Sequence, residues 1–287
     1  MEDAHAYDAK YLYQKRAVAF LDVLGFRQKL TDFEKEAEVN KSRLSSEDDE
    51  SAGKYMSQKT NDFINAFKVA ISSLDKSKYR YYLFSDNICI SSIEETTAAD
   101  LQDLLLVITK LFFEFAQRGY FLRGGIDYGL FIDEETIAIG NPLAVAYELE
   151  TKKAVYPRIV LSQRLIDEFQ SFNTDFKKEF ELFYSSALIQ ESCEIKYLNV
   201  FLHVFQSDYR EDRESFFLKF NSVISQNLEH NKNNETVFVK YKWLAEQFNQ
   251  FIDSFTGHLA FMDTDFNPDD ELGFLDFIKQ QKINYAN

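Results

Sequence analysis

Cysteine and histidine are both scarce in this chain of 287 residues, and each scarcity excludes a kind of site. The two cysteines, Cys89 and Cys193, form no CxxC pair, so no disulfide framework is expected. A chain with so few cysteines suits a reducing compartment, which predicts a cytoplasmic location. The four histidines are scattered along the sequence and give little support to a zinc site or a histidine base.

Long apolar runs and an excess of positive charge are also missing. The apolar runs are short and residues 1–15 are polar, so neither a membrane span nor a signal peptide is expected. The net charge of -15 argues against a surface that wraps nucleic acid or docks on an anionic membrane. Any phosphate that binds in a small, locally positive pocket is therefore expected to belong to a small molecule.

What the chain does have is the composition of a globular protein, with 45% hydrophobic and 28% charged residues. Its length allows one large domain or two moderate ones, in which roughly 75% of the unfolded surface is buried. Aromatic residues are abundant, which is more typical of a heavy core than of a binding surface.

The segment 16–30, RAVAFLDVLGFRQKL, combines a buried strand with an acid. The apolar run from Ala17 to Leu21 is flanked by charge, as in a strand that is buried on both faces of a sheet. Asp22 follows at once, and Gly25 could let backbone N–H groups approach a ligand at the start of a helix. An acid at this position is costly unless a cation, hydrogen bonds or a changed protonation state compensates it. The segment is a first indication of a metal.

A second acid, Asp86, is expected at the tip of a hairpin. The β-prone residues 79–84 and 88–92 flank the turn formers Ser85, Asp86 and Asn87. Adjacent strands of one sheet would place this acid beside Asp22. Two carboxylates with few other ligands suit one or two Mg²⁺ or Mn²⁺ ions that complete their shells with water and substrate phosphates. Because turn aspartates are common, the pair alone does not specify a metal site.

The other elements are predicted from periodicity and from turn residues. In chain order we expect a short helix over 27–33, a solvated insertion or mobile loop over 34–54, a helix over 63–74, a helix over 97–118, strands over 120–128 and 136–139, a helix from 140 to about 152, a strand over 157–162, a possible strand over 195–205, and helices over 215–228 and 236–255. Gly124 and Gly125 inside the strand over 120–128 indicate a bulge or the close approach of a ligand or another backbone.

This order predicts an α/β (α+β) fold, in which a mixed sheet with covering helices is related to the ferredoxin-like arrangement. We expect a core domain over 1–165, with the polar insertion at 34–54. Residues 166–287 are expected to form a mainly helical C-terminal extension that packs on the core or on a second subunit.

Four segments, taken in order, resemble the catalytic domain of the class III nucleotidyl cyclases. The family's motifs are an F-x-D-I-x-G-F strand and loop, a G-D hairpin, an R-I-G-I strand and a G-D-x-V-N-x-A-x-R-L-E helix start. The matching segments are AVAFLDVLGF at 17–26, YYLFSDNICI at 81–90, LRGGIDYGLF at 122–131 and IAIGNPLAVAYELE at 137–150. The resemblance covers roughly residues 15–165, and four ordered motifs are more specific than any one of them.

The resemblance implies roles for the residues of the first three motifs. Asp22 and Asp86 would be the metal-binding carboxylates, with Val23 beside them, and Arg123 would contact a phosphate. The backbone from Val23 to Phe26, through Leu24 and Gly25, would hold the triphosphate. The ribose 3′-hydroxyl would attack the α-phosphate of a nucleoside triphosphate and release pyrophosphate, assisted by two Mn²⁺ or Mg²⁺ ions.

The fourth motif departs from the family pattern. Ala144 stands where an asparagine would orient the ribose, and Glu148 stands where an arginine would stabilise the transition state. Either another cation replaces that arginine, with Lys152, Lys153 and Arg158 as candidates, or the protein is inactive.

The base pocket departs as well, and it points to one branch of the family. Tyr82 replaces a lysine of the purine-specific relatives, and Ile137 falls near their purine-reading acid. The chain therefore resembles the pyrimidine cyclases of the bacterial Pycsar anti-phage systems, which make cyclic UMP or cyclic CMP for a cyclic-nucleotide-sensing effector. The resemblance implies UTP or CTP as substrate and a homodimer with two shared sites.

Plainer interpretations stay open for each residue. Asp22 could cap a helix, Asp86 could be an ordinary turn residue, and Tyr82 could belong to the core. Arg123 could pair with an acid on a neighbouring strand, and Asp127, on the same strand face, suits an ionic or structural role. At the level of the whole chain, the alternatives are a degenerate cyclase fold that binds a nucleotide and signals, and a palm-type polymerase, although its GGDEF or GGDD hairpin is absent.

Overall fold

The central strand of the molecule is β1 (Gln14–Val23), which is buried from Arg16 to its end. It pairs antiparallel with β3 on one side and with β4 on the other.

The computed structural model describes residues 11–43, 54–72, 74–134, 137–171, 189–206, 210–259 and 268–285. The further strands are β2 (Tyr79–Phe84), β3 (Asn87–Ser92), β4 (Leu122–Glu134), β5 (Ile137–Gly140), β6 (Ile159–Leu161), β7 (Ile189–Ser192) and β8 (Ile195–Leu198). The helices are α1 (Phe26–Arg43), α2 (Gln58–Ser72), α3 (Ala98–Ala116), α4 (Asn141–Lys152), α5 (Gln163–Ser171), the 3₁₀ helix η1 (Val200–Gln206), α8 (Arg210–Asn231), α9 (Glu235–Leu259) and α10 (Pro268–Gln280).

The sheet has the expected ferredoxin-like core. Its strand order is β2-β3-β1-β4-β6-β8-β7, with β5 paired to β4. The first four strands, joined by α1 and α2, by a hairpin and by α3, lie in the order of the βαββαβ unit. Since β4 and β6 are parallel and the other described neighbours are antiparallel, the sheet is mixed. The predicted fold class is confirmed.

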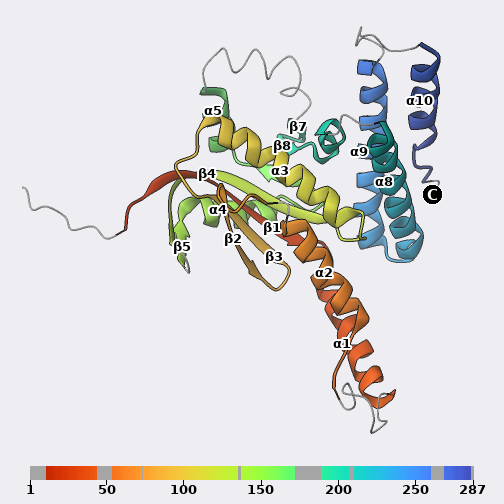
Figure 1. The fold of residues 1–287 in the computed structure, drawn as a ribbon, viewed down its shortest axis with the longest axis horizontal. Helices are drawn as coiled ribbons and strands as arrows, with labels where there is room; N and C mark the ends of the chain where they lie inside the picture. The colour runs from red at the N-terminus through yellow and green to blue at the C-terminus, as the bar shows by residue number, and fades with distance from the viewer. Residues whose placement is uncertain are drawn as a thin grey trace, which may run out of the picture.

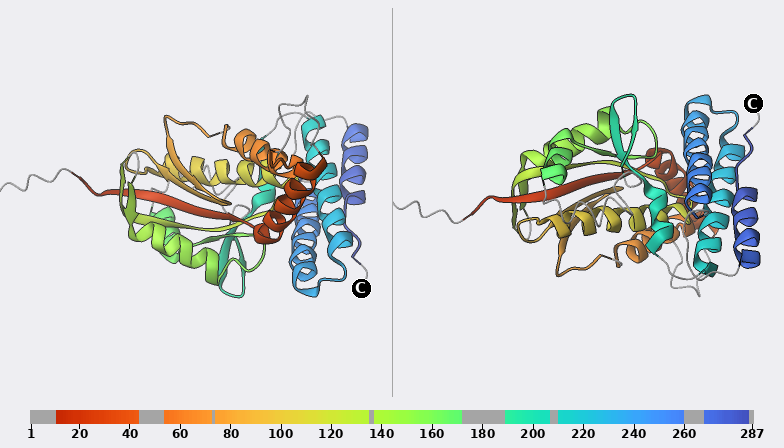
Figure 2. Two further views of the ribbon diagram at one scale, coloured as in Figure 1. Left: turned by 90° about the horizontal axis from the view of Figure 1, so that it is seen from below. Right: turned by 90° about the horizontal axis from the view of Figure 1, so that it is seen from above.

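The sheet carries helices on both faces. In Figure 2, α3 and α4 lie on opposite sides of the sheet. The larger core lies between the sheet and α2, α3, α8 and α9, whereas a small cluster that includes Phe20, Phe131 and Ala146 lies on the α4 side. The helices α8, α9 and α10 stand side by side at one end of the molecule (Figure 1).

Two adjacent glycines of β4 allow close packing around the strand. A Cβ atom at Gly125 would collide with the carbonyl oxygen of Ala146 in α4, and one at Gly124 would collide with that of Phe20 in β1. Close approach of another backbone is therefore confirmed as the reason for these glycines. The alternative, a bulge, does not occur against β1, because β4 pairs with β1 without interruption from Leu122 to Phe131.

Three predictions about local structure need correction. The segment 34–43 is helical, because α1 continues to Arg43, and Glu36 accepts hydrogen bonds from the Ser57 hydroxyl and the Lys59 backbone N–H at the start of α2. The rest of the predicted insertion, up to residue 53, lies outside the described residues. The apolar stretch 195–205 is a strand only as far as Leu198, after which η1 begins. The strands β7 and β8 join the same sheet, so the sheet continues beyond residue 165.

Candidate active site

Asp22 lies at the end of β1, where it faces both neighbouring strands. Its Cα pairs with that of Asn87 on β3 and with that of Arg123 on β4. The strand alternation that turns Leu21 and Val23 into the larger core turns Asp22 to the α4 side of the sheet. The residue is only 9% exposed, so the acid that stood out in the sequence is a buried carboxylate.

Asp86 lies beside Asp22, as the two motifs predicted. The turn Ser85-Asp86 joins β2 to β3, and Ser85 adopts a positive φ of 58°, which is uncommon outside glycine. The carboxyl group of Asp86 shares a hydrogen bond with that of Asp22. Burial and this hydrogen bond raise the pKa of Asp22 to about 7, although Arg123 opposes the shift. The two acids therefore form a pair in which one proton, or a cation, relieves the repulsion.

Arg123, at the start of β4, is ion-paired with acids on both sides. Its Nε and Nη2 atoms lie 2.8 and 2.7 Å from Oδ2 of Asp22, and Nη2 lies 2.7 Å from Oε1 of Glu150. The alternative interpretation, a pair with an acid on the neighbouring strand, thus describes the contacts that Arg123 makes in the structure. A phosphate that reached Arg123 would compete with these carboxylates for the guanidinium.

Glu150 of α4 is a member of the site that sequence reasoning missed. It is only 3% exposed, its pKa is raised by burial, and it hydrogen-bonds to Asp22. Its Oε1 atom makes the ion pair with Arg123 but no well-directed hydrogen bond. A signal was available in the sequence, because Glu150 lies one helical turn after the buried Ala146 on the face that meets the sheet.

The turn between β1 and α1 has the conformation that the glycine predicted. Gly25 has φ of +73°, in the left-handed region, and α1 begins at Phe26. One N–H of the proposed phosphate cradle is already used, since Leu24 donates to the carbonyl oxygen of Phe121 at 2.8 Å. The cradle that remains is the backbone at Gly25 and Phe26, at a helix N-terminus, where anions are favoured.

Tyr82 points into a polar cluster around Asp133. Its hydroxyl donates to the Asp133 carboxylate and to the carbonyl oxygen of Glu134, the latter at 3.2 Å. Burial and the neighbouring carboxylate raise the pKa of Tyr82 to about 12. The hydroxyl is therefore held as a donor within the protein.

The residues of the fourth motif that depart from the family are exposed. Ala144 and Glu148 lie one helical turn apart on the outer face of α4, and Glu148 pairs with Lys152. Arg158 is buried, donates to the carbonyl oxygen of Lys153 at 2.8 Å and lies over the rings of three aromatic residues, Tyr156, Tyr197 and Trp243. Lys152 and Arg158, two of the candidate cations, thus make their contacts with groups other than the two acids.

The C-terminal extension carries a further cation, Lys240, which is near enough to Arg123 for the two charges to repel. Lys240 of α9 is partly buried, and its pKa is lowered by burial and by the nearby charge of Arg123. The next residue, Tyr241, packs its ring against Phe121 with centroids 5.4 Å apart, just before β4 begins. No sequence signal pointed to Lys240, because the contact joins segments more than a hundred residues apart.

The donor set of the site fits Mg²⁺ or Mn²⁺. Asp22 and Asp86 offer paired carboxylate oxygens, and Mg²⁺ often uses one or two carboxylates together with water and substrate phosphates. Among the described residues no group of three or more acidic, histidine or cysteine side chains is arranged to hold a metal alone. Asp127, by contrast, is buried against Arg164 and Ser162, in the structural role expected of it.

Comparisons with known proteins concern the fold alone. No protein-family model matches the chain, and no curated protein matches it. Similar solved structures include the catalytic core of a rhodopsin-guanylyl cyclase with converted specificity in complex with ATPαS (14% identity, TM-score 0.37, 55% of this chain and 82% of that chain) and a bacterial light-regulated adenylyl cyclase (13% identity, TM-score 0.38, 74% of this chain and 59% of that chain). None of the helices in the described part of the chain is long and apolar enough to span a membrane. The chain is similar to these structures at the level of a mixed α/β fold, in which a mixed sheet is covered by helices.

Proposed function

We propose that the chain is a metal-dependent pyrimidine nucleotidyl cyclase, a lyase that converts UTP or CTP to the 3′,5′-cyclic monophosphate and pyrophosphate. The observation that carries the proposal is the hydrogen-bonded pair of Asp22 and Asp86 beside the turn into α1. A pair of acids, of which Asp22 is buried and Asp86 is partly buried, next to a helix N-terminus suits a ligand that brings both cations and phosphates. Arg123, from the third motif, is ion-paired with Asp22 of this pair.

The proposed reaction needs no side-chain nucleophile. The substrate's 3′-oxygen forms a bond to the α-phosphorus, the bond from that phosphorus to the pyrophosphate oxygen breaks, and the hydroxyl proton passes to solvent. Asp22 and Asp86, with Val23 beside them, would hold two Mg²⁺ or Mn²⁺ ions. When bound, such ions lower the pKa of the attacking hydroxyl and neutralise the phosphate oxygens. The backbone at Gly25 and Phe26 would bind the triphosphate.

Preference for a pyrimidine is supported by Tyr82 and Ile137, which stand where the resemblance places the residues that read the base. Tyr82 and Ile137 do not provide the hydrogen bonds that adenine or guanine needs, and the Tyr82 hydroxyl is already engaged by Asp133. The ring of Tyr82 is bulkier than the lysine side chain that it replaces, so the remaining space suits a pyrimidine, which is smaller than a purine. We further propose that the product acts on a cyclic-nucleotide-sensing effector, as in anti-phage signalling.

A homodimer would cover an exposed aromatic group on the α4 side of the sheet. Phe84 and Tyr147 are about half exposed, and both rings contact Phe20, with centroids 6.0 and 5.3 Å away. Ala144 and Glu148 lie on the same exposed helix as Tyr147. A second copy on this face would bury the aromatic group and would bring new side chains to the departures of the fourth motif.

The test is incubation of the purified chain with each of the four nucleoside triphosphates and Mn²⁺. Cyclic UMP or cyclic CMP and an equal amount of pyrophosphate are expected, with far less product from ATP and GTP. Release of no cyclic product and no pyrophosphate would reject catalysis. A light-scattering mass equal to one chain under the assay conditions would contradict the homodimer.

A second function is favoured by one observation, the acid Glu148 at the place of the family's arginine. In this alternative the chain binds a nucleotide without turning it over and signals by a change in its contacts. Tight binding of UTP or CTP with no product would support it. Loss of a measured activity in Asp22→Ala would exclude it.

Lys240 is expected to supply the positive charge that the fourth motif lacks. Replacing it with glutamine should lower kcat/KM by about 10- to 100-fold, because a charge-assisted contact to phosphate is lost. Arg should preserve most of the activity, since the charge remains. The matched control is Lys242→Gln, which removes the same charge from the same helix where the ammonium lies over Tyr285. Equal kcat/KM values for Lys240→Gln and the control would contradict this role.

A further inference from the structure

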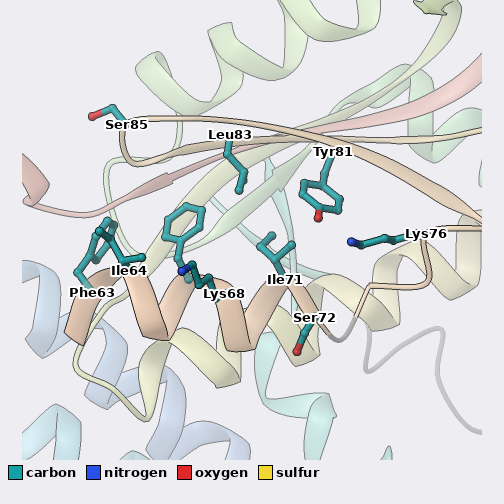
Figure 3. A pocket seen from close by; sticks show the side chains of 10 residues that line it. Phe63, Ile64, Lys68, Ile71, Ser72, Lys76, Tyr81, Leu83 and Ser85 are labelled. Carbon is teal, nitrogen blue, oxygen red and sulfur yellow. The ribbon is translucent and has the colours of Figure 1, made fainter. Parts of the chain in front are cut away.

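A groove between α2 and β2 lies outside the candidate active site and is not used by the proposed reaction. Its volume is about 490 Å³. Figure 3 shows Tyr81 and Leu83 pointing from β2 toward α2, where Ile64 and Ile71 face them. The two walls of the groove are therefore mainly apolar.

The groove exists because β2 is the edge strand and α2 does not close against it. The helix turns Phe63 and Phe67 into the core, but it leaves Ile64 42% exposed. Across the gap, Leu83 is 46% exposed. Apolar side chains that face each other across an open gap stay in contact with water, so an apolar ligand that fills the gap is favoured.

The charges of the groove are positive in a chain whose net charge is -15. Among the described residues that line it, the charged side chains are Lys68 and Lys76, and none is a carboxylate or an amide. The Lys76 ammonium lies 5.9 Å from the centroid of the Tyr81 ring. This lining suits an anionic head group, whereas it offers no carboxylate or amide to pair with the edge of a nucleobase.

The groove is also elongated. It follows α2 from Phe63 to Ser72, nine residues farther along the helix, which corresponds to ~14 Å. We propose that it binds a single-chain fatty acid, with the alkyl chain along α2 and the carboxylate attracted by the positive charges of Lys68 and Lys76.

The probe is dodecanoate, titrated into the full chain below its micelle concentration and followed by calorimetry. One saturable site per chain is expected. Octanoate should bind at least 10-fold more weakly. It lacks four of the methylenes of dodecanoate, and each methylene removed from an apolar site weakens binding by up to about fourfold. Dodecyltrimethylammonium, which has the same alkyl chain and the opposite charge, should show no saturable binding. No saturable site for dodecanoate, or equal affinity for the cation, overturns the proposal.

Two variants locate the site. Ile64→Trp fills the groove from an exposed position and should abolish binding of dodecanoate. The double variant Lys68→Gln/Lys76→Gln changes only exposed side chains and should weaken binding at least 10-fold. The matched control, Lys59→Gln, removes a charge from an exposed position of the same helix that does not line the groove, and it should bind as the unaltered chain does. Unchanged affinity in the double variant overturns the proposal even if Ile64→Trp fails to fold.

Discussion

Replacing Asp22 with asparagine is expected to lower the proposed cyclase activity by at least ~1,000-fold, because one of two paired metal-binding carboxylates is removed. Asp86→Asn is expected to have a similar effect, since the pair acts as one unit. Product formation from UTP and CTP with Mn²⁺ measures both. The exposed acid Glu229 of α8, which pairs with Lys232, provides the control Glu229→Gln. Activity of Asp22→Asn within tenfold of the control would contradict the role of Asp22.

The same variant is expected to be more stable than the unaltered chain at neutral pH when no metal is present. The pKa of Asp22 is about 7 in the folded chain, against 3.8 as the ordinary value. The folded state therefore holds the proton more tightly than the unfolded state. The contribution of Asp22 to the free energy of unfolding is therefore fully present below pH 4, falls as pH rises from 4 to 7, and has lost on the order of 2–4 kcal/mol above pH 7.

Asparagine carries no charge to be desolvated, so the stability of Asp22→Asn should not show this fall. Urea unfolding in EDTA from pH 4.5 to 8 measures the difference, which should grow with pH in favour of the variant. Added Mn²⁺ should raise the melting temperature of the unaltered chain but not that of Asp22→Asn. Parallel pH profiles for the two chains would contradict the raised pKa. Together the two expectations describe an acid that is kept for chemistry at the expense of stability.

The parts of the fold that the sequence predicted are those set by short-range patterns. The Ser85-Asp86-Asn87 turn and the capping residue Thr97 mark their element boundaries locally, and the structure has a capping box between Thr97 and Asp100. Likewise, the alternation of β1 is enough to turn Asp22 away from the larger core. These signals located the two acids and the hairpin that brings them together.

The parts that the sequence did not predict depend on contacts between distant segments. Glu150 reaches Arg123 because α4 packs closely on β4 at Gly125, and Lys240 lies near the charge of Arg123 in a helix, α9, that packs against Phe121. A polar stretch such as 34–43 becomes helical once Glu36 can cap the next helix. None of these contacts follows from local propensity, since each is decided by burial and pairing in the tertiary structure.

Replacing Asp133 with alanine is expected to cost about 3–5 kcal/mol of stability, the largest loss we expect from a single charged residue here. Its side chain is fully buried and accepts hydrogen bonds from the hydroxyls of Tyr82 and Ser91. Two arginines pair with it, Arg80 at 3.0 Å and Arg16 at 3.5 Å. The carboxylate thus joins β4 to β1, β2 and β3 from one point.

The loss follows from what alanine would leave behind. Arg16 is almost fully buried and would keep its charge without the carboxylate, while Tyr82 and Ser91 would lose the acceptor of their hydroxyls. The control is Asp103→Ala, which breaks an exposed pair with Lys78 and should cost less than about 1 kcal/mol. Urea unfolding measures both free energies of unfolding. A loss below 1 kcal/mol for Asp133→Ala would contradict the role of this carboxylate in joining β4 to β1, β2 and β3. The same carboxylate also holds the Tyr82 hydroxyl. If Asp133→Ala folds, it should therefore discriminate less between pyrimidine and purine triphosphates. Asp133 in this way couples the stability of the sheet edge to the proposed base pocket.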